Sequence, residues 1–321
     1  MTGSPSAATA LMALMKLPRV GRRAALRIVT SRPGEVDPSS YRESIFSRAG
    51  IAKLPERELA EAWKRAEEEL EKGAAAGIRA FSIHDPCYPP RLSEIPDPPA
   101  VLFVKGDPQA VHSSKTVAIV GTREPTPYGE TVARRSGKTA VEAGFAVVSG
   151  LAHGCDTLAH EGCLDASGVG VAVMAHGLDK VYPAANRALA ARLLENGGCL
   201  VSEYPVGTAA ARTAFAERDR IQSGLSDGVF VIETDVKGGT MHTVRFSRDQ
   251  RRPLACISHP DKWLSENKTK GNQMMIADGW ATPIPDGPAL LSFLSRIGGG
   301  DRTPSRKQGP DESDPQGSLA L

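Results

Sequence analysis

The segment KTVAIVGTREPTPYGE, residues 115–130, decides the fold class of this chain. It joins a short apolar run at 116–120 to a glycine turn at Gly121 and then to the start of a helix-like segment. The run is rich in valine and isoleucine and is too short for a buried helix, so it predicts a strand covered on both faces. A buried strand that turns directly into a helix is typical of α/β proteins with a parallel sheet.

The same strand-and-helix unit recurs along the chain. Strand-like runs followed by segments of helical length occupy 116–120, 146–149, 171–174, 199–202, 229–232 and 254–257. Further strand-like runs lie at 79–83, 100–104 and 280–284. This alternation predicts an α/β fold with a doubly wound, mostly parallel, Rossmann-like sheet.

Composition divides the chain into three regions. In residues 1–74 apolar positions recur three and four apart, which predicts a small all-α domain. Residues 75–297 carry the strand-like runs and therefore the sheet domain. Residues 298–321 are rich in Gly, Pro, Ser and charge, so we expect a disordered tail.

Charge and cysteine content exclude several classes of protein. The 39 Lys+Arg against 37 Asp+Glu exclude a uniformly basic surface but leave room for a local basic groove.

The sequence has no apolar stretch long enough to span a membrane, and its N-terminal charges follow the apolar run, unlike those of a signal peptide. The five scattered cysteines contain no CxxC pair. We therefore expect a cytoplasmic protein with buried or incidental thiols, no metal site and no cofactor.

Glycine turns after three of the predicted strands are candidate ligand sites. In an open parallel sheet, ligands bind beyond the carboxyl ends of the strands, where helix N-termini present amide groups. The candidates are Gly121, Thr122 and Arg123; Ser149, Gly150, Leu151 and His153; and Lys237, Gly238, Gly239 and Thr240. Any one turn is explained by the change from strand to helix, but three at one sheet edge indicate a phosphate site. The fingerprints GxGxxG and GxxxxGK[ST] are absent, which argues against the usual nucleotide sites.

An arginine-rich segment precedes the run at 229–232. Arg218 and Arg220, with Phe215 nearby, suit single-stranded nucleic acid, because cations follow its backbone and rings stack on its bases. A solvated helix in which Glu217 and Asp219 neutralise the arginines explains the composition equally well. The sequence contains no HExxH motif, and no GxSxG pattern follows a predicted strand as a nucleophile elbow does, so we expect no catalytic residues and no enzyme activity.

The order of these motifs resembles that of the DNA-processing protein A family, also called DprA or Smf. The resemblance extends over most of residues 8–297. It rests on VAIVGTR at 117–123, TPYG at 126–129, VSGLA at 148–152, GLDKVYPAAN at 177–186, SEYP at 202–205 and FAERDRIQSGLS at 215–226.

The resemblance implies a non-catalytic protein of DNA processing and natural transformation. Members of the family bind incoming single-stranded DNA, form homodimers and help to load the RecA recombinase. Their extended Rossmann fold follows a sterile-alpha-motif-like domain, which the helical residues 1–74 resemble. Carried over to this chain, the DNA pocket consists of residues from the three glycine turns together with Arg218 and Arg220. Many members also end in a winged-helix domain, and the expected tail leaves no such domain in this chain.

Departures from the family pattern keep two alternatives open. Glu217 and Asp219 lie among the arginines and should weaken phosphate binding, and His153 stands where arginine is common. The first alternative is a nucleotide-binding or nucleotide-hydrolysing protein related to phosphoribohydrolases, which a mononucleotide should occupy in preference to an oligonucleotide. The second is a diverged member that binds a protein partner through its helical domain and has no affinity for DNA.

Overall fold

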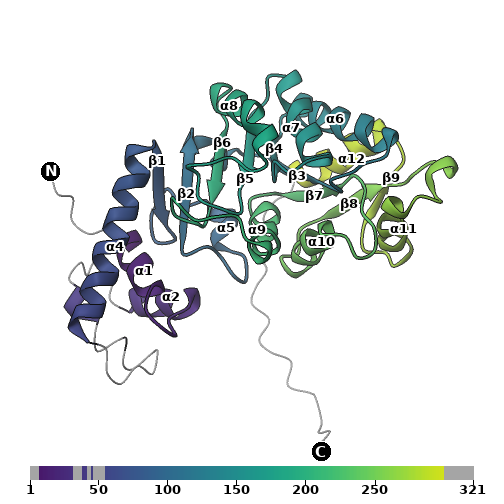
Figure 1. The fold of residues 1–321 in the computed structure, drawn as a ribbon. Helices are drawn as coiled ribbons and strands as arrows, with labels where there is room; N and C mark the ends of the chain where they lie inside the picture. Colours follow the sequence, from purple (N-terminus) through teal and green to yellow (C-terminus); the bar gives the residue numbers. More distant parts are fainter. Residues whose placement is uncertain (1–6, 32–37, 42–44, 46–54, 300–321) are drawn as a thin grey trace, which may run out of the picture.

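The computed structural model describes residues 7–31, 38–41, 45 and 55–299. Its centre is a nine-stranded sheet with the order β1-β2-β6-β5-β4-β3-β7-β8-β9 (Figure 1). The strands are β1 (Ile78–Ser82), β2 (Val101–Gly106), β3 (Thr116–Val120), β4 (Ala146–Ser149), β5 (Gly170–Val173), β6 (Cys199–Ser202), β7 (Gly228–Val231), β8 (Leu254–Ile257) and β9 (Thr282–Ile284). Neighbours from β6 to β9 are parallel, whereas β2 is antiparallel to both β6 and β1. The predicted Rossmann-like α/β class is confirmed.

Helices cover both faces of the sheet. The α-helices are α1 (Ala7–Met15), α2 (Arg22–Thr30), α4 (Glu56–Ala75), α5 (Pro90–Ser93), α6 (Pro127–Glu142), α7 (Cys155–Asp165), α8 (Arg187–Glu195), α9 (Arg212–Gly224), α10 (Thr240–Asp249), α11 (Lys270–Ala277) and α12 (Gly287–Gly298). Short 3₁₀ turns are η1 (Pro38–Tyr41), η2 (Pro108–His112), η3 (Ala184–Asn186), η4 (Asp261–Trp263) and η5 (Asn267–Thr269). In Figure 1, α6, α7 and α12 lie on one side of β3 and β7, and α9, α10 and α11 lie on the other.

Strand β3 shows why the sheet has two apolar faces. Its side chains alternate, so that Ile119 joins the apolar cluster under α6, α7 and α12. Val120 joins the cluster under α5, α9, α10 and α11. Every residue of β3 is buried, as expected for a strand covered on both faces.

The N-terminal helices pack at the β1 end of the sheet. Leu11 of α1 and Trp63 of α4 belong to one buried cluster that also contains Ile78 of β1 and Phe103 of β2. Helix α4 ends two residues before β1 begins at Ile78, close to the predicted boundary at residue 75. The division into a helical domain and a sheet domain stays a prediction. Of the expected tail at 298–321, Gly298 instead ends α12, and residues 300–321 lie outside the described residues.

Four of the five cysteines are buried, as predicted, and Cys87 is exposed. No described helix is both long enough and apolar enough to cross a membrane. Within the described ranges, no group of three His, Cys, Asp or Glu side chains has the arrangement of a metal site.

Candidate functional site

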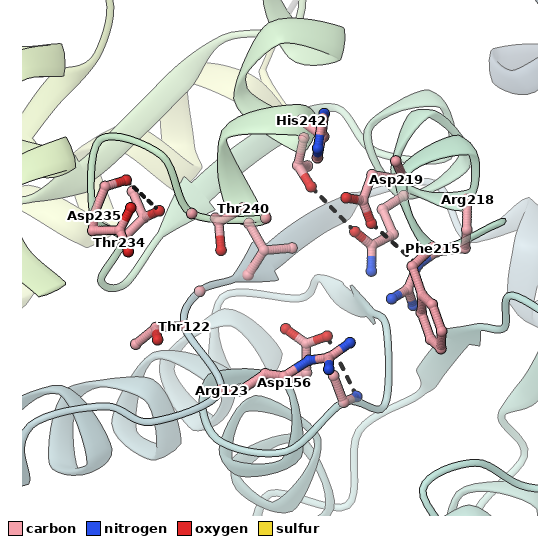
Figure 2. A pocket seen from close by; sticks show the side chains of 18 of the residues that line it. Thr122, Arg123, Asp156, Phe215, Arg218, Asp219, Thr234, Asp235, Thr240 and His242 are labelled. Atoms are coloured by element: carbon pink, nitrogen blue, oxygen red, sulfur yellow. Dashed lines mark hydrogen bonds and ion pairs between the residues drawn. The ribbon is translucent and has the colours of Figure 1, made fainter. Parts of the chain in front are cut away.

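A cavity of about 770 Å³ opens at the carboxyl ends of β3 and β7. Its walls come from the turn after β3, the start of α7, helix α9 and the turn between β7 and α10 (Figure 2). The predicted binding residues that line it are Gly121, Thr122, Arg123, Phe215, Arg218, Lys237, Gly238, Gly239 and Thr240. The first and third glycine turns therefore meet at one edge of the sheet, as parallel topology requires.

Three exposed cations line this cavity: Arg123 after β3, Arg212 at the start of α9 and Lys237 after β7. In the part of the chain that the structure describes, none of them forms an ion pair with an acid. The guanidinium carbon of Arg123 lies 5.4 Å from the centre of the Phe215 ring, within the range of a cation–π contact. We refer to Arg123, Arg212 and Lys237 as the rim cations.

Arg218 also lines the cavity, and the protein uses one of its guanidinium nitrogens. Its side chain is buried, and Nη1 donates hydrogen bonds to the carbonyl oxygens of Val173 and of Gly150, the latter at 2.8 Å. Its Nε lies 3.2 Å from Oδ1 of Asp219. Arg218 therefore holds α9 against the ends of β4 and β5.

Arg220 does not reach the cavity. It is 2% exposed, and Nη1 and Nη2 each donate to the Glu203 carboxylate at 2.6 Å. The same carboxylate accepts a hydrogen bond from Nη1 of Arg22 in α2 at 2.9 Å, and Asp97 is a further acid close to both arginines. The predicted DNA contact at Arg220 is corrected here, because this bidentate ion pair commits its guanidinium to joining α9 to β6 and α2.

Of the second glycine turn, Ala152 lines the cavity but none of the four predicted contacts does. Ser149, Gly150 and Leu151 are buried, and Ser149 Oγ donates to the carbonyl oxygen of Ile119 at 2.7 Å. A Cβ atom at Gly150 would collide with the Arg218 guanidinium. His153 is exposed but lies outside the cavity lining. The turn is thus a packed junction between β4 and α7, and DNA contact at these four residues stays a prediction.

Three acids lie in the cavity wall: Asp156, Asp219 and Asp235. Asp235 is exposed, and its Oδ1 accepts a hydrogen bond from the Lys237 amide at 2.6 Å. Asp156 accepts hydrogen bonds from the amides of Gly150 at 3.1 Å and Ala152 at 3.4 Å, so it caps the second turn. Burial raises the pKa of Asp156, and the positive charge of Arg218 opposes this shift. Burial also raises the pKa of Asp219 to about 7, again against the pull of Arg218. Glu217 lies outside the cavity, where it accepts a hydrogen bond from the Tyr204 hydroxyl at 2.9 Å.

The loop that carries Arg123 is held by a buried carboxylate that the sequence patterns did not single out. Glu233, which follows β7, accepts hydrogen bonds from the Thr126 amide at 2.8 Å and its hydroxyl at 2.6 Å. The Glu233 carbonyl accepts from the Thr122 amide at 2.7 Å. Both contacts tie the turn after β3 to the end of β7, so the two cation-bearing turns keep a fixed separation.

Several other lining residues were not predicted as contacts. They are Val120, Ala152, Asp156, Arg212, Ala216, Asp219, Gln222, Thr234, Asp235, His242 and Thr243. Arg212 lies one helical turn before Phe215, and that spacing would have placed both on one side of α9. Asp235 follows β7 at the carboxyl edge of the sheet, so the rule that selected Lys237 would also have found it. Figure 2 shows Asp235 and Thr234 facing the side of the cavity opposite Phe215.

Comparison with known proteins identifies relatives of this chain. The sequence profile of the family described as DNA recombination-mediator protein A matches residues 79–295. The Smf protein of Escherichia coli is 40% identical over 192 residues, which are 60% of this chain and 50% of the relative. DNA processing protein DprA of Bacillus subtilis is 38% identical over 181 residues, 56% of this chain and 61% of the relative. The chain thus spans about half the length of the Smf relatives it matches.

Two solved structures share the fold. DNA processing protein A of Streptococcus pneumoniae superposes with a TM-score of 0.70 at 27% identity, covering 89% of this chain and 94% of that one. DNA processing protein A of Helicobacter pylori superposes with a TM-score of 0.60 at 26% identity, covering 68% and 96%. The Helicobacter structure is described as revealing that protein's single-stranded DNA binding mode.

Proposed function

The chain belongs to the DNA recombination-mediator protein A family, and from this premise we propose that it binds single-stranded DNA in the cavity at the carboxyl edge of its sheet. The observation that carries the proposal is the set of rim cations. They are exposed, they border one cavity, and they have no acidic partner among the described residues. A cavity bordered by unpaired cations and an aromatic ring suits a chain of phosphates and bases.

Each part of the wall has a role in this proposal. Arg123, Arg212 and Lys237 bind successive phosphates of the strand. The first turn of α10 contributes Gly239 and Thr240, and a helix N-terminus attracts phosphate through its amide groups and its dipole. Phe215 holds the Arg123 guanidinium at the cavity wall through the cation–π contact. Because every base has a flat face and every nucleotide a phosphate, binding depends little on sequence and strongly on salt.

The proposal assigns the site to binding, not to catalysis. Asp156 uses its carboxylate to accept two backbone amides, Asp219 pairs with Arg218, and Asp235 accepts the Lys237 amide, so all three acids serve the architecture of the wall. On the strength of family membership we extend the proposal to natural transformation: a cytoplasmic homodimer that protects incoming single strands and helps to load the RecA recombinase.

Fluorescence anisotropy of a labelled oligo-thymidine tests the binding proposal. We expect tight, salt-sensitive binding of the single strand, weaker binding of duplex DNA, and no displacement by a mononucleotide at comparable concentration. Displacement by the mononucleotide would instead favour a nucleotide-binding protein related to phosphoribohydrolases. No binding of either would leave a protein partner of the helical segment as the remaining alternative.

A further inference from the structure

An aromatic ring stands exposed just outside the cavity. Tyr182 is 51% exposed, and only Val236 and Leu291 are comparably exposed among the large hydrophobic side chains of the described residues. It lies in the loop between β5 and α8, a segment that supplies no residue to the cavity wall. Half of the ring surface is therefore available to a partner.

The loop that carries Tyr182 is anchored to the rest of the protein. Pro183, next in the chain, is buried. Asn186 is also buried, and its Nδ2 donates hydrogen bonds to the Leu151 carbonyl and to Thr157 Oγ1, both at 2.8 Å. These contacts fix the loop to the turn after β4 and to α7, so the tyrosine is presented by a rigid support.

Tyr182 continues a row of flat groups that begins inside the cavity. Its ring centre is 5.8 Å from that of Phe215, with the two planes inclined by 53°. On Phe215, the guanidinium carbon of Arg123 lies 5.4 Å from the ring centre. The row therefore runs from Arg123 and Phe215 in the cavity wall outward to Tyr182 beyond it.

The distance between the Tyr182 and Phe215 rings determines where a base can bind. A base inserted between two rings needs about 7 Å, twice the ~3.5 Å contact distance between carbon atoms. The Tyr182 and Phe215 rings are closer than that and are tilted, so no base fits between them. The free surface for stacking is the exposed side of Tyr182.

The charges of the loop favour a nucleic acid on that surface. Lys180 and Arg187 lie on either side of the tyrosine in sequence, and both are exposed. The acid of this loop, Asp179, accepts a hydrogen bond from the Gly207 amide at 2.8 Å. A base on the ring would therefore have cations available for the phosphates on either side of it. A purely apolar partner would gain nothing from these charges.

We propose that Tyr182 is a further DNA-contacting residue, on which a base stacks as the single strand leaves the cavity. This inference rests on the proposed function, and it adds a direction to it: the strand exits past Phe215 toward the loop between β5 and α8. The strand footprint thus extends beyond the cavity by at least the nucleotide that Tyr182 receives.

The test compares Tyr182→Ala, Tyr182→Phe and the control Leu291→Ala, which removes an equally exposed apolar side chain on α12. The ligands are an oligo-thymidine longer than the cavity and an abasic oligonucleotide of the same length. Tyr182→Ala should weaken thymidine binding by roughly 5- to 150-fold, the equivalent of the ~1–3 kcal/mol that stacking contributes per base. Tyr182→Phe and Leu291→Ala should bind as the wild type does. Abasic binding and the salt dependence should not change, because no phosphate contact is removed.

Three results would overturn the inference, and they differ from one another. If the wild type binds oligo-thymidine and Tyr182→Ala binds it equally well, the tyrosine has no role and the cavity proposal stands. If Tyr182→Ala loses thymidine and abasic binding to the same extent, the ring supports the loop and does not stack on a base. If the wild type binds no single strand at all, the proposed function fails and this inference fails with it.

Discussion

Arginines lie both in the buried half of α9 and at the rim of the cavity, but their environments differ. Arg218 and Arg220 point into the protein and use their guanidinium groups on carbonyls and carboxylates of distant elements. Arg123 and Arg212 lie on the cavity surface with no acid paired to them among the described residues. An arginine-rich segment is therefore not in itself a phosphate site. The position of the acids, brought from elsewhere in the chain, decides which arginines remain available.

The largest expected effect comes from breaking the buried pair. Arg220→Ala leaves the Glu203 carboxylate, whose side chain is 8% exposed, with Arg22 as its remaining ion-pair partner. Removing one member of a buried ion pair costs about 3–5 kcal/mol, and we expect the free energy of unfolding in urea to fall by about that amount. Arg212→Ala, on the exposed first turn of the same helix, serves as the control and should change stability by less than about 0.5 kcal/mol. A fully stable Arg220→Ala protein that has lost DNA binding would contradict this account, because Arg220 would then contact the ligand and not support the fold.

The rim should show the opposite behaviour. Arg123→Ala removes one charge-assisted contact worth about 1.5–3 kcal/mol, so affinity for oligo-thymidine should fall roughly 10- to 100-fold with stability unchanged. Arg296→Ala is a matched control, because that guanidinium lies 5.5 Å from the Phe293 ring centre on α12, away from the cavity. The variants are compared by anisotropy and by urea unfolding. Equal losses of affinity in both would mean that general surface charge, not the cavity, binds the strand.

Two glycines of the cavity wall distinguish a role in packing from a role in ligand binding. A Cβ atom at Gly121 would lie 2.5 Å from Cys155 Sγ, whereas one at Gly239 would meet nothing within 4 Å. Gly121→Ala should therefore destabilise the fold by about 1–3 kcal/mol through overpacking, and Gly239→Ala should leave stability unchanged. Any loss of DNA affinity in Gly239→Ala would then report contact with the ligand. Thermal unfolding of both variants checks the first expectation, and a stable Gly121→Ala protein would contradict it.

The smallest expected effect concerns Asp219. With a pKa raised to about 7 by burial, this carboxyl is charged above that pH and neutral below it. Its negative charge opposes phosphate binding, so affinity should rise as the pH is lowered from 8 to 6. The change should be about fivefold at most, since unit charges about 4 Å apart in water interact by about 1 kcal/mol.

Asp219→Asn isolates this effect from other titrating groups, because His242 lines the same cavity. The variant should bind more tightly than the wild type at pH 8 and equally at pH 6. An identical pH profile in both proteins would assign the dependence to another group.

The sequence predicted the sheet well and the site only in part, for one physical reason. Strands such as β3 and β6 are marked by local apolar runs, and the position of Arg123 and Lys237 follows from the rule that parallel strands end at one edge. Whether the Arg220 guanidinium is available to a ligand depends on Glu203 and on Arg22, which is 181 residues from Glu203 in the sequence. No local pattern contains that pairing. For the same reason the hydrogen bonds of buried Glu233 and the Tyr182–Phe215 contact could not be predicted from the sequence.

The central claim is that the rim cations bind the phosphates of a single strand. The most direct test measures the affinity of oligo-thymidine against salt concentration for the wild type and for a variant with Arg123, Arg212 and Lys237 all changed to alanine. Each lost phosphate contact lowers the slope of log K against log salt by about 0.7, so we predict a slope smaller by about 2 in a protein that remains folded. A folded triple variant with the wild-type slope and affinity would contradict the claim.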